Sequence, residues 1–240
     1  MIATLVAAAV AMPTPAQLPT VPRLIQSAQP IYCAGPRGRS FALTFDDGPS
    51  PYTPDLVRVL RRARARATFF DVGSRLALWP SAARASTTVG EIGNHTWSHA
   101  HLLGLSPADA TNELVWAQDE MRRVLGIDPQ LFRPPYAEAN AADDAVARQL
   151  GLLDVRWSAD SGDSRFGATP RAVARVAIAA LRPGAIILLH DPHPSTATVA
   201  RVVLRAARRK GLRPVTVSTL LARQPPSSAQ LGGSGHSRCP

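Results

Sequence analysis

The sequence predicts an α/β fold built on a parallel sheet, either doubly wound or closed into a (β/α) barrel. Strand-like and helix-like segments alternate along most of the chain, and this alternation is typical of parallel strands with helices on both sheet faces. The continuous apolar run at 185–189 is the sequence that a strand buried on both faces requires. At 240 residues the chain is long enough for one barrel-sized domain with a large core.

The individual elements follow from short β-prone runs and from the apolar periodicity of the segments between them. The helix at 107–126 has the clearest start, because Ser106 is a capping residue, Pro107 suits the first position and Asp109 is the N3 acid. The predicted strands are 40–45, 66–72, 88–93, 130–133, 152–157, 185–189 and 213–217. The predicted helices are 53–64, 75–85, 107–126, 138–150, 170–182 and 195–210.

The two ends of the chain differ in composition from its middle. Residues 1–22 resemble a secretory signal, with a short apolar run followed by small residues, although no charged residue precedes Arg23. This segment predicts a secreted or cell-envelope protein, and no later stretch is apolar enough to span a bilayer. We expect a lead-in at 23–37, one folded domain at 38–222, and a flexible Pro-, Ser- and Gly-rich tail at 223–240.

The charge of the chain indicates which classes of binding partner are favoured, and its cysteine content indicates whether the protein is exported. The formal net charge is +10, and arginine supplies nearly all of the positive charge because Lys210 is the only lysine. A basic surface favours anionic partners such as cell-wall polymers, and nucleic acid is disfavoured because RNA-type aromatic motifs and zinc-finger spacing are absent. The two cysteines, Cys33 and Cys239, are predicted to form a disulfide in an exported protein.

Two adjacent carboxylates, Asp46 and Asp47, follow the predicted strand at 40–45. An Asp-Asp-Gly-Pro turn is one interpretation, but adjacent like charges also suit a site where a cation relieves their repulsion. His95 and His99 are four residues apart, so on one helical turn both imidazoles would face the same side. Two histidines and Asp47 form a ligand set that fits Zn²⁺ in a hydrolase or Fe(II) in an oxygenase, and a purely structural pair remains the alternative.

Further polar residues follow other predicted strands, and the carboxyl ends of parallel strands meet at one edge of the sheet. Arg133 is either a surface residue or an ion-pair partner that orients Asp46. His190 is either a satisfied core histidine or a protonated general acid. In the second case Asp160 or Asp163 would be its carboxylate partner.

Taken together, these segments resemble the polysaccharide deacetylase family, the NodB-homology domain of carbohydrate esterase family 4, over roughly residues 38–222. The resemblance implies a distorted, incomplete (β/α) barrel of seven or eight parallel strands. It also implies one divalent ion, most simply Zn²⁺ with Co²⁺ as the alternative. The five matching motifs are TFDDGP at 44–49, HTWSH at 95–99, RPPY at 133–136, DSGD at 160–163 and LLHD at 188–191.

The resemblance assigns a role to each matching residue. Three side chains would hold the ion. Two pairs of residues would act in proton transfer, one containing the general base and the other the general acid. The assignments are Asp47, His95 and His99 as metal ligands, Asp46 as base with Arg133 bracing it, His190 as acid with Asp163 tuning it, the Tyr136 backbone N–H at the oxyanion, and Leu188 at the acetyl methyl group.

The implied activity is hydrolysis of N-acetyl groups on N-acetylglucosamine-containing polysaccharide, either peptidoglycan or chitin oligomers. An O-acetyl esterase acting on acetylated xylan, an iron oxygenase and a non-catalytic glycan-binding module remain alternatives. Ser164 stands where the family commonly has Trp, so one wall of the acetyl pocket is missing or comes from another side chain such as Phe166. Ala137 stands where the family usually has glycine. Neither the particular polymer nor the oligomeric state follows from the sequence.

Overall fold

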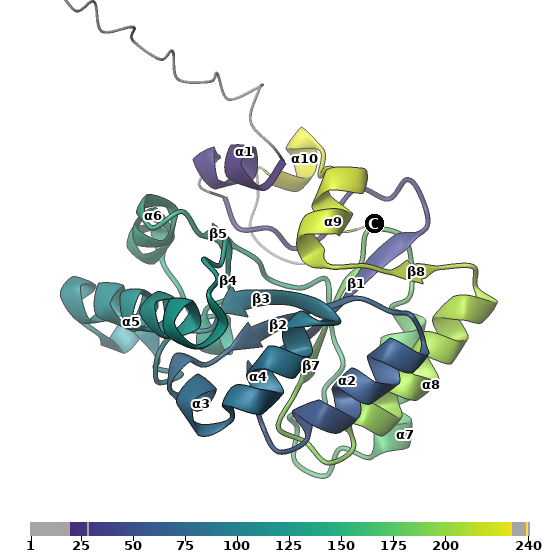
Figure 1. The fold of residues 1–240 in the computed structure, drawn as a ribbon. Helices are drawn as coiled ribbons and strands as arrows, with labels where there is room; N and C mark the ends of the chain where they lie inside the picture. Colours follow the sequence, from purple (N-terminus) through teal and green to yellow (C-terminus); the bar gives the residue numbers. More distant parts are fainter. Residues whose placement is uncertain (1–19, 28, 232–238, 240) are drawn as a thin grey trace, which may run out of the picture.

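The computed structural model describes residues 20–27, 29–231 and 239, and its centre is a curled parallel sheet (Figure 1). Seven strands follow the order β5-β4-β3-β2-β1-β7-β6, and β8 pairs with the start of β1. All of these pairs are parallel, which confirms the predicted incomplete (β/α) barrel. The strands are β1 (Ser40–Gly48), β2 (Ala67–Asp71), β3 (Gly90–Asn94), β4 (Leu131–Phe132), β5 (Leu153–Asp154), β6 (Ala159–Asp160), β7 (Ile186–His190) and β8 (Arg213–Pro214).

Helices cover the outside of the curl and also close one of its ends. Figure 1 shows α2, α8 and α7 along one flank, α5 and α6 on the other, and α1, α9 and α10 grouped apart from them. The outer helices are α2 (Thr53–Arg62), α3 (Gly73–Leu78), α4 (Pro80–Thr87), α5 (Pro107–Leu125), α6 (Ala141–Gln149), α7 (Pro170–Ala179) and α8 (Thr196–Arg209). The end group is α1 (Thr20–Gln26), α9 (Val217–Arg223) and α10 (Ser228–Leu231), and short 3₁₀ turns lie at Leu102–Gly104 and Pro135–Ala137.

The central strand β1 separates two kinds of environment. Its odd-numbered residues Phe41, Leu43 and Phe45 pack in the main core with apolar residues of α2, α7 and α8. Ala42 faces the other way, into a second core that includes residues of α1 and α9. Side chains alternate along a strand, so the inner face of β1 continues through Thr44 to Asp46 at the carboxyl end of the sheet.

Two predicted helices have different boundaries in the structure. The segment predicted at 75–85 forms α3 and α4, because the ring of Pro80 disfavours helical geometry at Trp79, whose φ and ψ are −129° and 52°. The segment predicted from 138 starts at Ala141, where Asn140 and Asp143 form a capping box. The start of α5 is as predicted, since the Ser106 side chain accepts a hydrogen bond from the Asp109 backbone N–H.

Two strand predictions were also inexact, and one short strand was not predicted. The segment predicted at 213–217 is a strand only over Arg213–Pro214, because Thr216 caps α9 with its side chain. The segment predicted at 152–157 is a strand only at Leu153–Asp154, and the short strand β6 at Ala159–Asp160 was not predicted. These pieces contain two residues each and are edge strands or additions to the main sheet, so they carry little strand signal of their own.

The ends of the chain only partly match expectation. Residues 1–19 of the signal-like segment lie outside the described residues, and α1 occupies part of the predicted lead-in. The expected flexible tail instead contains α10, and Gln224 is buried, with its side-chain oxygen accepting from the Ser40 backbone N–H. Among the described helices, none is both long and apolar enough to cross a membrane.

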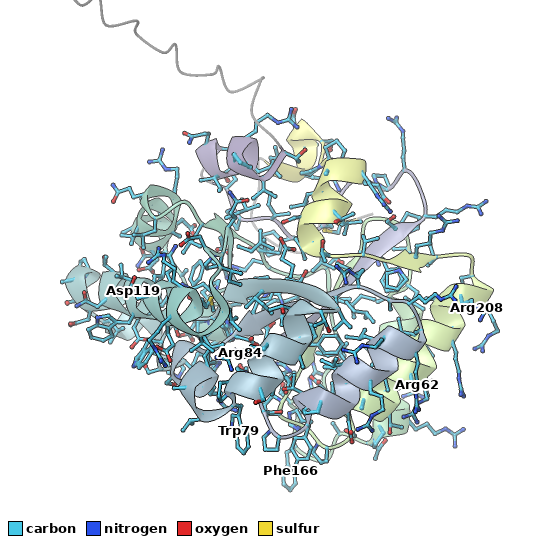
Figure 2. All side chains as sticks on the ribbon, viewed as in Figure 1. Arg62, Trp79, Arg84, Asp119, Phe166 and Arg208 are labelled. Carbon is cyan, nitrogen blue, oxygen red and sulfur yellow. A yellow bond between two sulfur atoms is a disulfide. The ribbon has the colours of Figure 1, made fainter. Side chains whose placement is uncertain are left out.

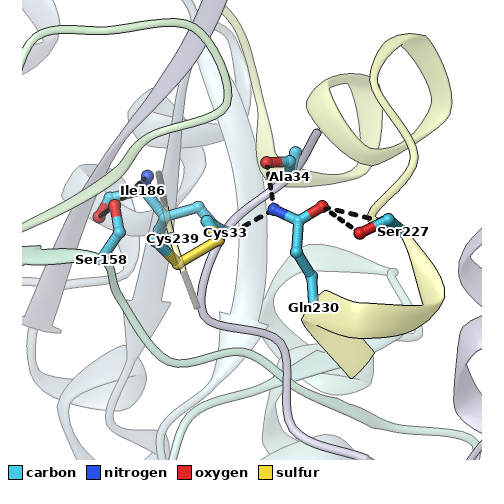
Figure 3. Close-up of a disulfide and its surroundings, with 7 residues drawn as sticks. All are labelled: Cys33, Ala34, Ser158, Ile186, Ser227, Gln230 and Cys239. Atoms are coloured by element: carbon cyan, nitrogen blue, oxygen red, sulfur yellow. Dashed lines mark hydrogen bonds between the residues drawn. A yellow bond between two sulfur atoms is a disulfide. The ribbon is translucent and has the colours of Figure 1, made fainter. Parts of the chain in front are cut away.

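The predicted disulfide between Cys33 and Cys239 is present, with 5.8 Å between the two Cα atoms (Figure 3). Gln230 of α10 lies beside it and donates hydrogen bonds to Cys33 Sγ and to the Ala34 carbonyl. The disulfide and Gln230 therefore tie the C-terminal segment to the chain just before β1.

Candidate active site

The five sequence motifs meet at the carboxyl edge of the sheet, as the parallel topology predicts. Asp46 and His190 are register partners on the neighbouring strands β1 and β7. Arg133 directly follows β4, and its backbone N–H donates to the carbonyl of Asn94 at the end of β3. Polar residues at the carboxyl ends of β1, β3, β4 and β7 therefore lie together at one edge of the sheet.

Asp46 is paired with a completely buried arginine. Arg133 Nη1 donates to Asp46 Oδ1 at 2.7 Å and to Thr44 Oγ1 at 2.7 Å, so both acceptors lie on the inner face of β1. The Asp46 side chain is only 4% exposed and the Arg133 side chain is 0% exposed. A buried, hydrogen-bonded ion pair of this kind fixes the orientation of the carboxylate.

The surroundings of Arg133 hold its guanidinium in one position. Arg133 Nε donates to the Val155 carbonyl and Nη2 donates to the Arg156 carbonyl, at 2.8 and 2.9 Å. The guanidinium carbon also lies 4.1 Å from the centre of the Phe70 ring. The interpretation of Arg133 as a surface residue is therefore wrong.

The carboxylate of Asp47 faces the two histidines instead of Arg133. Its Oδ1 lies 3.2 Å from His95 Nε2 and 3.0 Å from His99 Nε2. Neither approach has hydrogen-bond geometry, and the buried Oδ1 has no hydrogen-bond partner among the described residues. Burial raises the pKa of the Asp47 carboxyl, but the adjacent imidazoles outweigh burial and hold the pKa below its ordinary range.

These three residues fit a divalent metal ion. One donor atom from each of Asp47, His95 and His99 lies within 4.8 Å of the others. His95 Nδ1 donates to the Arg133 carbonyl at 2.6 Å, so Nε2, which points toward Asp47, is the ring nitrogen that remains to bind an ion. An unpartnered carboxylate oxygen beside two imidazole nitrogens is a donor set that suits a zinc-like ion.

The two histidines do not lie on a helical turn, which corrects the prediction from their spacing. Residues 95–99 form a loop in which Thr96 and His99 have φ of 63°. The loop is held by Gly73 and Ser74, whose backbone N–H groups donate to the carbonyls of Thr96 and Trp97. The imidazoles converge because the backbone turns back at left-handed residues, which a right-handed helix excludes.

Tyr136 lies against the outer histidine of the cluster. Its hydroxyl is 3.1 Å from His99 Nδ1, and its ring stacks on His101 with 3.7 Å between ring centres. His101 Nδ1 lies 2.9 Å from Glu138 Oε2. Sequence reasoning missed His101 and Glu138, although each lies two residues after a recognisable motif.

His190 forms the second proton-handling pair. Its Nδ1 donates to Asp163 Oδ1 at 2.7 Å, and its backbone N–H donates to Asp163 Oδ2 at 2.7 Å. Burial alone would lower the pKa of His190, but the hydrogen bond and charge of Asp163 raise it to about 9. Asp163, and not Asp160, is therefore the carboxylate partner of the histidine, whose ring is protonated at neutral pH.

The remaining predicted residues are found near this edge as well. Leu188 is 3% exposed and pairs in register with Thr44 of β1. Tyr136 and Ala137 both adopt left-handed backbone conformations, with φ of 59° and 60°. Phe166 is 108% exposed, so the idea that it forms a pocket wall in place of the usual Trp is not supported.

A buried ion pair that the sequence analysis missed supports the Tyr136 segment. Arg156 forms a salt bridge with Asp154 at 2.8 Å and also donates to the Ala137 carbonyl. The pKa of Asp144 rises to about 7 through burial and the nearby Asp154. The spacing of Asp154 and Arg156 places both on one strand face, which is the only sequence signal for this pair.

One further buried carboxyl lies under the TFDDGP segment. Asp71 is 1% exposed and its Oδ2 has no hydrogen-bond partner among the described residues. Burial and the charges of Asp191 and Asp46 raise the pKa of Asp71 well above its ordinary value. A Cβ atom on Gly48 would lie 2.6 Å from Asp71 Oδ1, so the turn after Asp47 has no room for a side chain.

Comparison with known proteins gives consistent matches. The family model described as polysaccharide deacetylase matches residues 34–155. The chain is 33% identical to peptidoglycan-N-acetylglucosamine deacetylase PgdA of Listeria monocytogenes over 184 residues, which cover 76% of this chain and 39% of that protein. It therefore spans about two fifths of that relative's length. It is 40% identical to the chitooligosaccharide deacetylase of a Bradyrhizobium strain over 159 residues, which cover 65% of this chain and 72% of the relative.

A solved structure shares the same architecture. The family 4 carbohydrate esterase from Streptomyces lividans in complex with acetate superimposes with a TM-score of 0.70 and 34% identity. The match covers 74% of this chain and 92% of that chain.

Proposed function

Because the chain belongs to the polysaccharide deacetylase family, we propose that it hydrolyses N-acetyl groups on N-acetylglucosamine-containing polysaccharide. The names of its relatives favour peptidoglycan or chitin oligomers as the substrate. A cell-wall polymer would be met in the cell envelope or outside the cell, which agrees with the signal-like segment at 1–22.

One observation carries the proposal. Asp46, the proposed general base, is ion-paired with buried Arg133. His190, the proposed general acid, is ion-paired with Asp163 and is the register partner of Asp46. Both pairs lie beside the cluster of Asp47, His95 and His99. Two groups poised to accept and donate a proton next to a metal-ligand cluster are the parts that hydrolysis of an amide requires. An iron oxygenase would need the cluster but neither proton-handling pair.

The first step needs a water molecule and a base. A divalent ion held by Asp47, His95 and His99, most simply Zn²⁺, would supply Lewis-acid activation of water and of the acetyl carbonyl. Asp46 accepts the proton of the attacking water. The hydrogen bond from Arg133 holds the Asp46 carboxylate in one orientation on the inner face of β1, so that it is positioned as a base.

The second step needs an acid. His190 donates its Nε2 proton to the leaving sugar nitrogen, because Nδ1 is already engaged by Asp163. The negative charge of Asp163 keeps the imidazole protonated until that moment. Acetate and a free amine are then released.

The acetyl group would be oriented by two residues next to these pairs. The Tyr136 backbone N–H would stabilise the developing oxyanion, and the loss of such a donor typically costs about 2.7–4 kcal/mol of transition-state stabilisation. Leu188, on the inner face of β7, would contact the methyl group.

Side-by-side measurement of acetate release tests this function. Acetylated chitooligosaccharide, peptidoglycan and acetylated xylan are incubated with Zn²⁺- or Co²⁺-supplemented protein, with Asp46→Asn as the matched control. Release from the first two substrates supports N-deacetylation. Release from xylan alone would show an O-acetyl esterase, and glycan binding without any release would show a binding module.

A further inference from the structure

The net positive charge of the chain comes from its last third. Residues 164–240 contain twelve Arg and Lys residues and a single carboxylate, Asp191, whereas residues 1–163 contain fifteen Arg and Lys and sixteen Asp and Glu. Asp191 is 1% exposed and therefore contributes little to the surface charge. The net charge of +10 thus arises from one region, and such asymmetry is typical of a protein that binds an anionic surface.

The fold gathers this charge on α7 and α8. The two helices contain no Asp or Glu, and they pack side by side. Arg171 and Arg175 of α7 and Arg205 and Arg209 of α8 are exposed. Within the described residues, none of these four arginines has a carboxylate within salt-bridge distance.

The neighbouring helix α2 extends the same surface. It packs against α8 and carries exposed Arg61 and Arg62, and Figure 2 shows Arg62 and Arg208 on this flank of the molecule. On the other flank, the arginines of α5 are neutralised, since Arg122 pairs with Asp119 and Asp128 and Arg123 pairs with Glu120. Exposed arginines without a salt-bridge partner also occur elsewhere, such as Arg84 of α4 and Arg148 of α6, and Arg58 of α2 pairs with Asp55. What distinguishes α7 and α8 is that these two packed helices together carry six exposed arginines and no Asp or Glu.

An apolar groove of about 790 Å³ runs between α7 and α8. Its lining includes Pro170, Ala174 and Ile178 from α7 and Val199 and Val202 from α8. Among these residues Val202 is 39% exposed. Apolar side chains in the middle of a charged face lie in water unless a partner covers them.

Helical spacing aligns the arginines with this groove. Arg171 and Arg175 precede Ile178 by seven and three residues, so all three share one side of α7. Arg205 and Arg209 follow Val202 by three and seven residues, so they share one side of α8. The groove is therefore bordered by two rows of unpaired guanidinium groups.

We propose that the α7–α8 groove and its bordering arginines bind the surface of an anionic phospholipid bilayer. Guanidinium groups would contact the headgroup phosphates, and the groove residues would contact the acyl chains just below them. A soluble polyanion would satisfy the arginines but would leave Val202 and the groove in water. The combination of apolar and cationic side chains therefore favours a bilayer.

This binding mode has a geometric relation to the active-site edge. α7 follows β6 and α8 follows β7, so both helices begin at the carboxyl edge of the sheet, where Asp163 and His190 lie. The groove lining starts at Thr169 and Thr198, in the first turns of the two helices. A bilayer bound there would lie beside the active-site edge and would not block the opposite flank.

Vesicle co-sedimentation of the full chain tests the proposal. One set of vesicles is phosphatidylcholine alone, and the other is an equal mixture of phosphatidylglycerol and phosphatidylcholine. The apolar segment at 1–22 would bind both sets alike, so the difference between them reports on the basic face. We expect stronger binding to the phosphatidylglycerol vesicles, and the difference should disappear in high salt.

Substitutions identify the surface. Each arginine contributes about fivefold to partitioning onto an anionic bilayer. The triple variant Arg171→Gln, Arg175→Gln and Arg205→Gln should therefore lower binding at least tenfold. Val202→Ser should lower it severalfold while leaving the charge unchanged. Arg122→Gln with Arg123→Gln removes two paired arginines from α5 and serves as the control, with binding close to that of the unaltered chain.

We expect every variant to remain folded, because all of the substituted side chains are solvent-exposed. Thermal unfolding of each variant checks this. Equal binding to both vesicle types would overturn the proposal. An equal loss in the α5 control would show that net charge alone matters. Competition by soluble polyglutamate, together with unchanged binding of Val202→Ser, would identify a soluble polyanion as the partner instead.

Discussion

Asp46 and Asp47 are adjacent in sequence, but their carboxylates contact different partners. Asp46 Oδ1 accepts a hydrogen bond from Arg133 at 2.7 Å, whereas Asp47 Oδ1 lies 3.2 and 3.0 Å from the Nε2 atoms of His95 and His99. Asp47 has φ of 66°, and this left-handed conformation turns its side chain away from that of its neighbour. The backbone thus separates two like charges into two distinct chemical environments.

The first prediction follows from this separation. Asp46→Asn should leave the metal content nearly unchanged and lower turnover by about 10²–10⁴, because a positioned proton acceptor is lost. Asp47→Asn should lower the metal content first, and excess metal should partly restore its activity. Elemental analysis and acetate release are measured for both variants. Loss of metal from Asp46→Asn with retention in Asp47→Asn would reverse the two roles.

The second prediction concerns the titration of His190 in the metal-free protein. Its pKa is raised from 6.5 to about 9, so the Asp163 interaction stabilises the fold fully below pH 6.5 and is lost as the pH rises through about 9. Asp163→Asn should bring the pKa of His190 back toward or below its ordinary value. Imidazole NMR signals followed against pH measure both forms, and an unchanged pKa in the variant would contradict the assignment.

The third prediction concerns the buried pair of Arg156 and Asp154. Arg156→Met should lower the free energy of unfolding by about 3–5 kcal/mol, since it leaves the Asp154 carboxylate buried without its partner. Combining Arg156→Met with Asp154→Asn should be less destabilising than Arg156→Met alone. Denaturant unfolding of the two single variants and the double variant gives the coupling energy, and purely additive effects would argue against the pair.

The fourth prediction concerns the backbone at Ala137. Its φ of 60° is costly for any residue with a Cβ atom, so Ala137→Gly should raise the free energy of unfolding by about 1 kcal/mol. The control is Ala145→Gly within α6, where glycine should be destabilising by about 1 kcal/mol. Thermal unfolding compares the two variants, and a loss of stability in both would show that the loop does not strain Ala137.

The fifth prediction concerns the link between Cys33 and Cys239, which are 206 residues apart. Closing a loop of that length restricts the unfolded chain, so Cys33→Ser with Cys239→Ser should lower the free energy of unfolding by about 5 kcal/mol. Denaturant unfolding measures the loss, and peptide mass spectrometry without reduction checks the bond in secreted material. Two free thiols there would show that the bond does not form.

The sequence allowed the sheet and most site residues to be predicted, because both depend on strand ends. Because the carboxyl ends of parallel strands lie at one edge, Asp46 and His190 were expected at the same edge, and the pairing of β1 with β7 in the structure makes them direct neighbours. The choice between Asp160 and Asp163 could not be made from sequence, since both lie in the same loop. Only the two hydrogen bonds from His190 to Asp163 distinguish them.

Other features could not be predicted because their determinants are distant in sequence. The spacing of His95 and His99 is the same on a helical turn and on a loop, and contacts from Gly73 and Ser74 decide for the loop. Arg133 is buried only because carbonyl groups of residues 155 and 156 surround it. The C-terminal helix α10 has a composition typical of disorder, but Gln230 anchors it to Cys33 and Ala34.

The disulfide also changes the topology of the molecule. Cys33 precedes β1 and Cys239 follows α10, so every proposed site residue from Asp46 to His190 lies within a single covalent ring. A protease outside the cell could cut an exposed loop, such as the one carrying the fully exposed Phe166, and the two fragments would stay joined. The nicked protein would then keep Asp46 and His190 in one molecule, and its fragments could not diffuse apart.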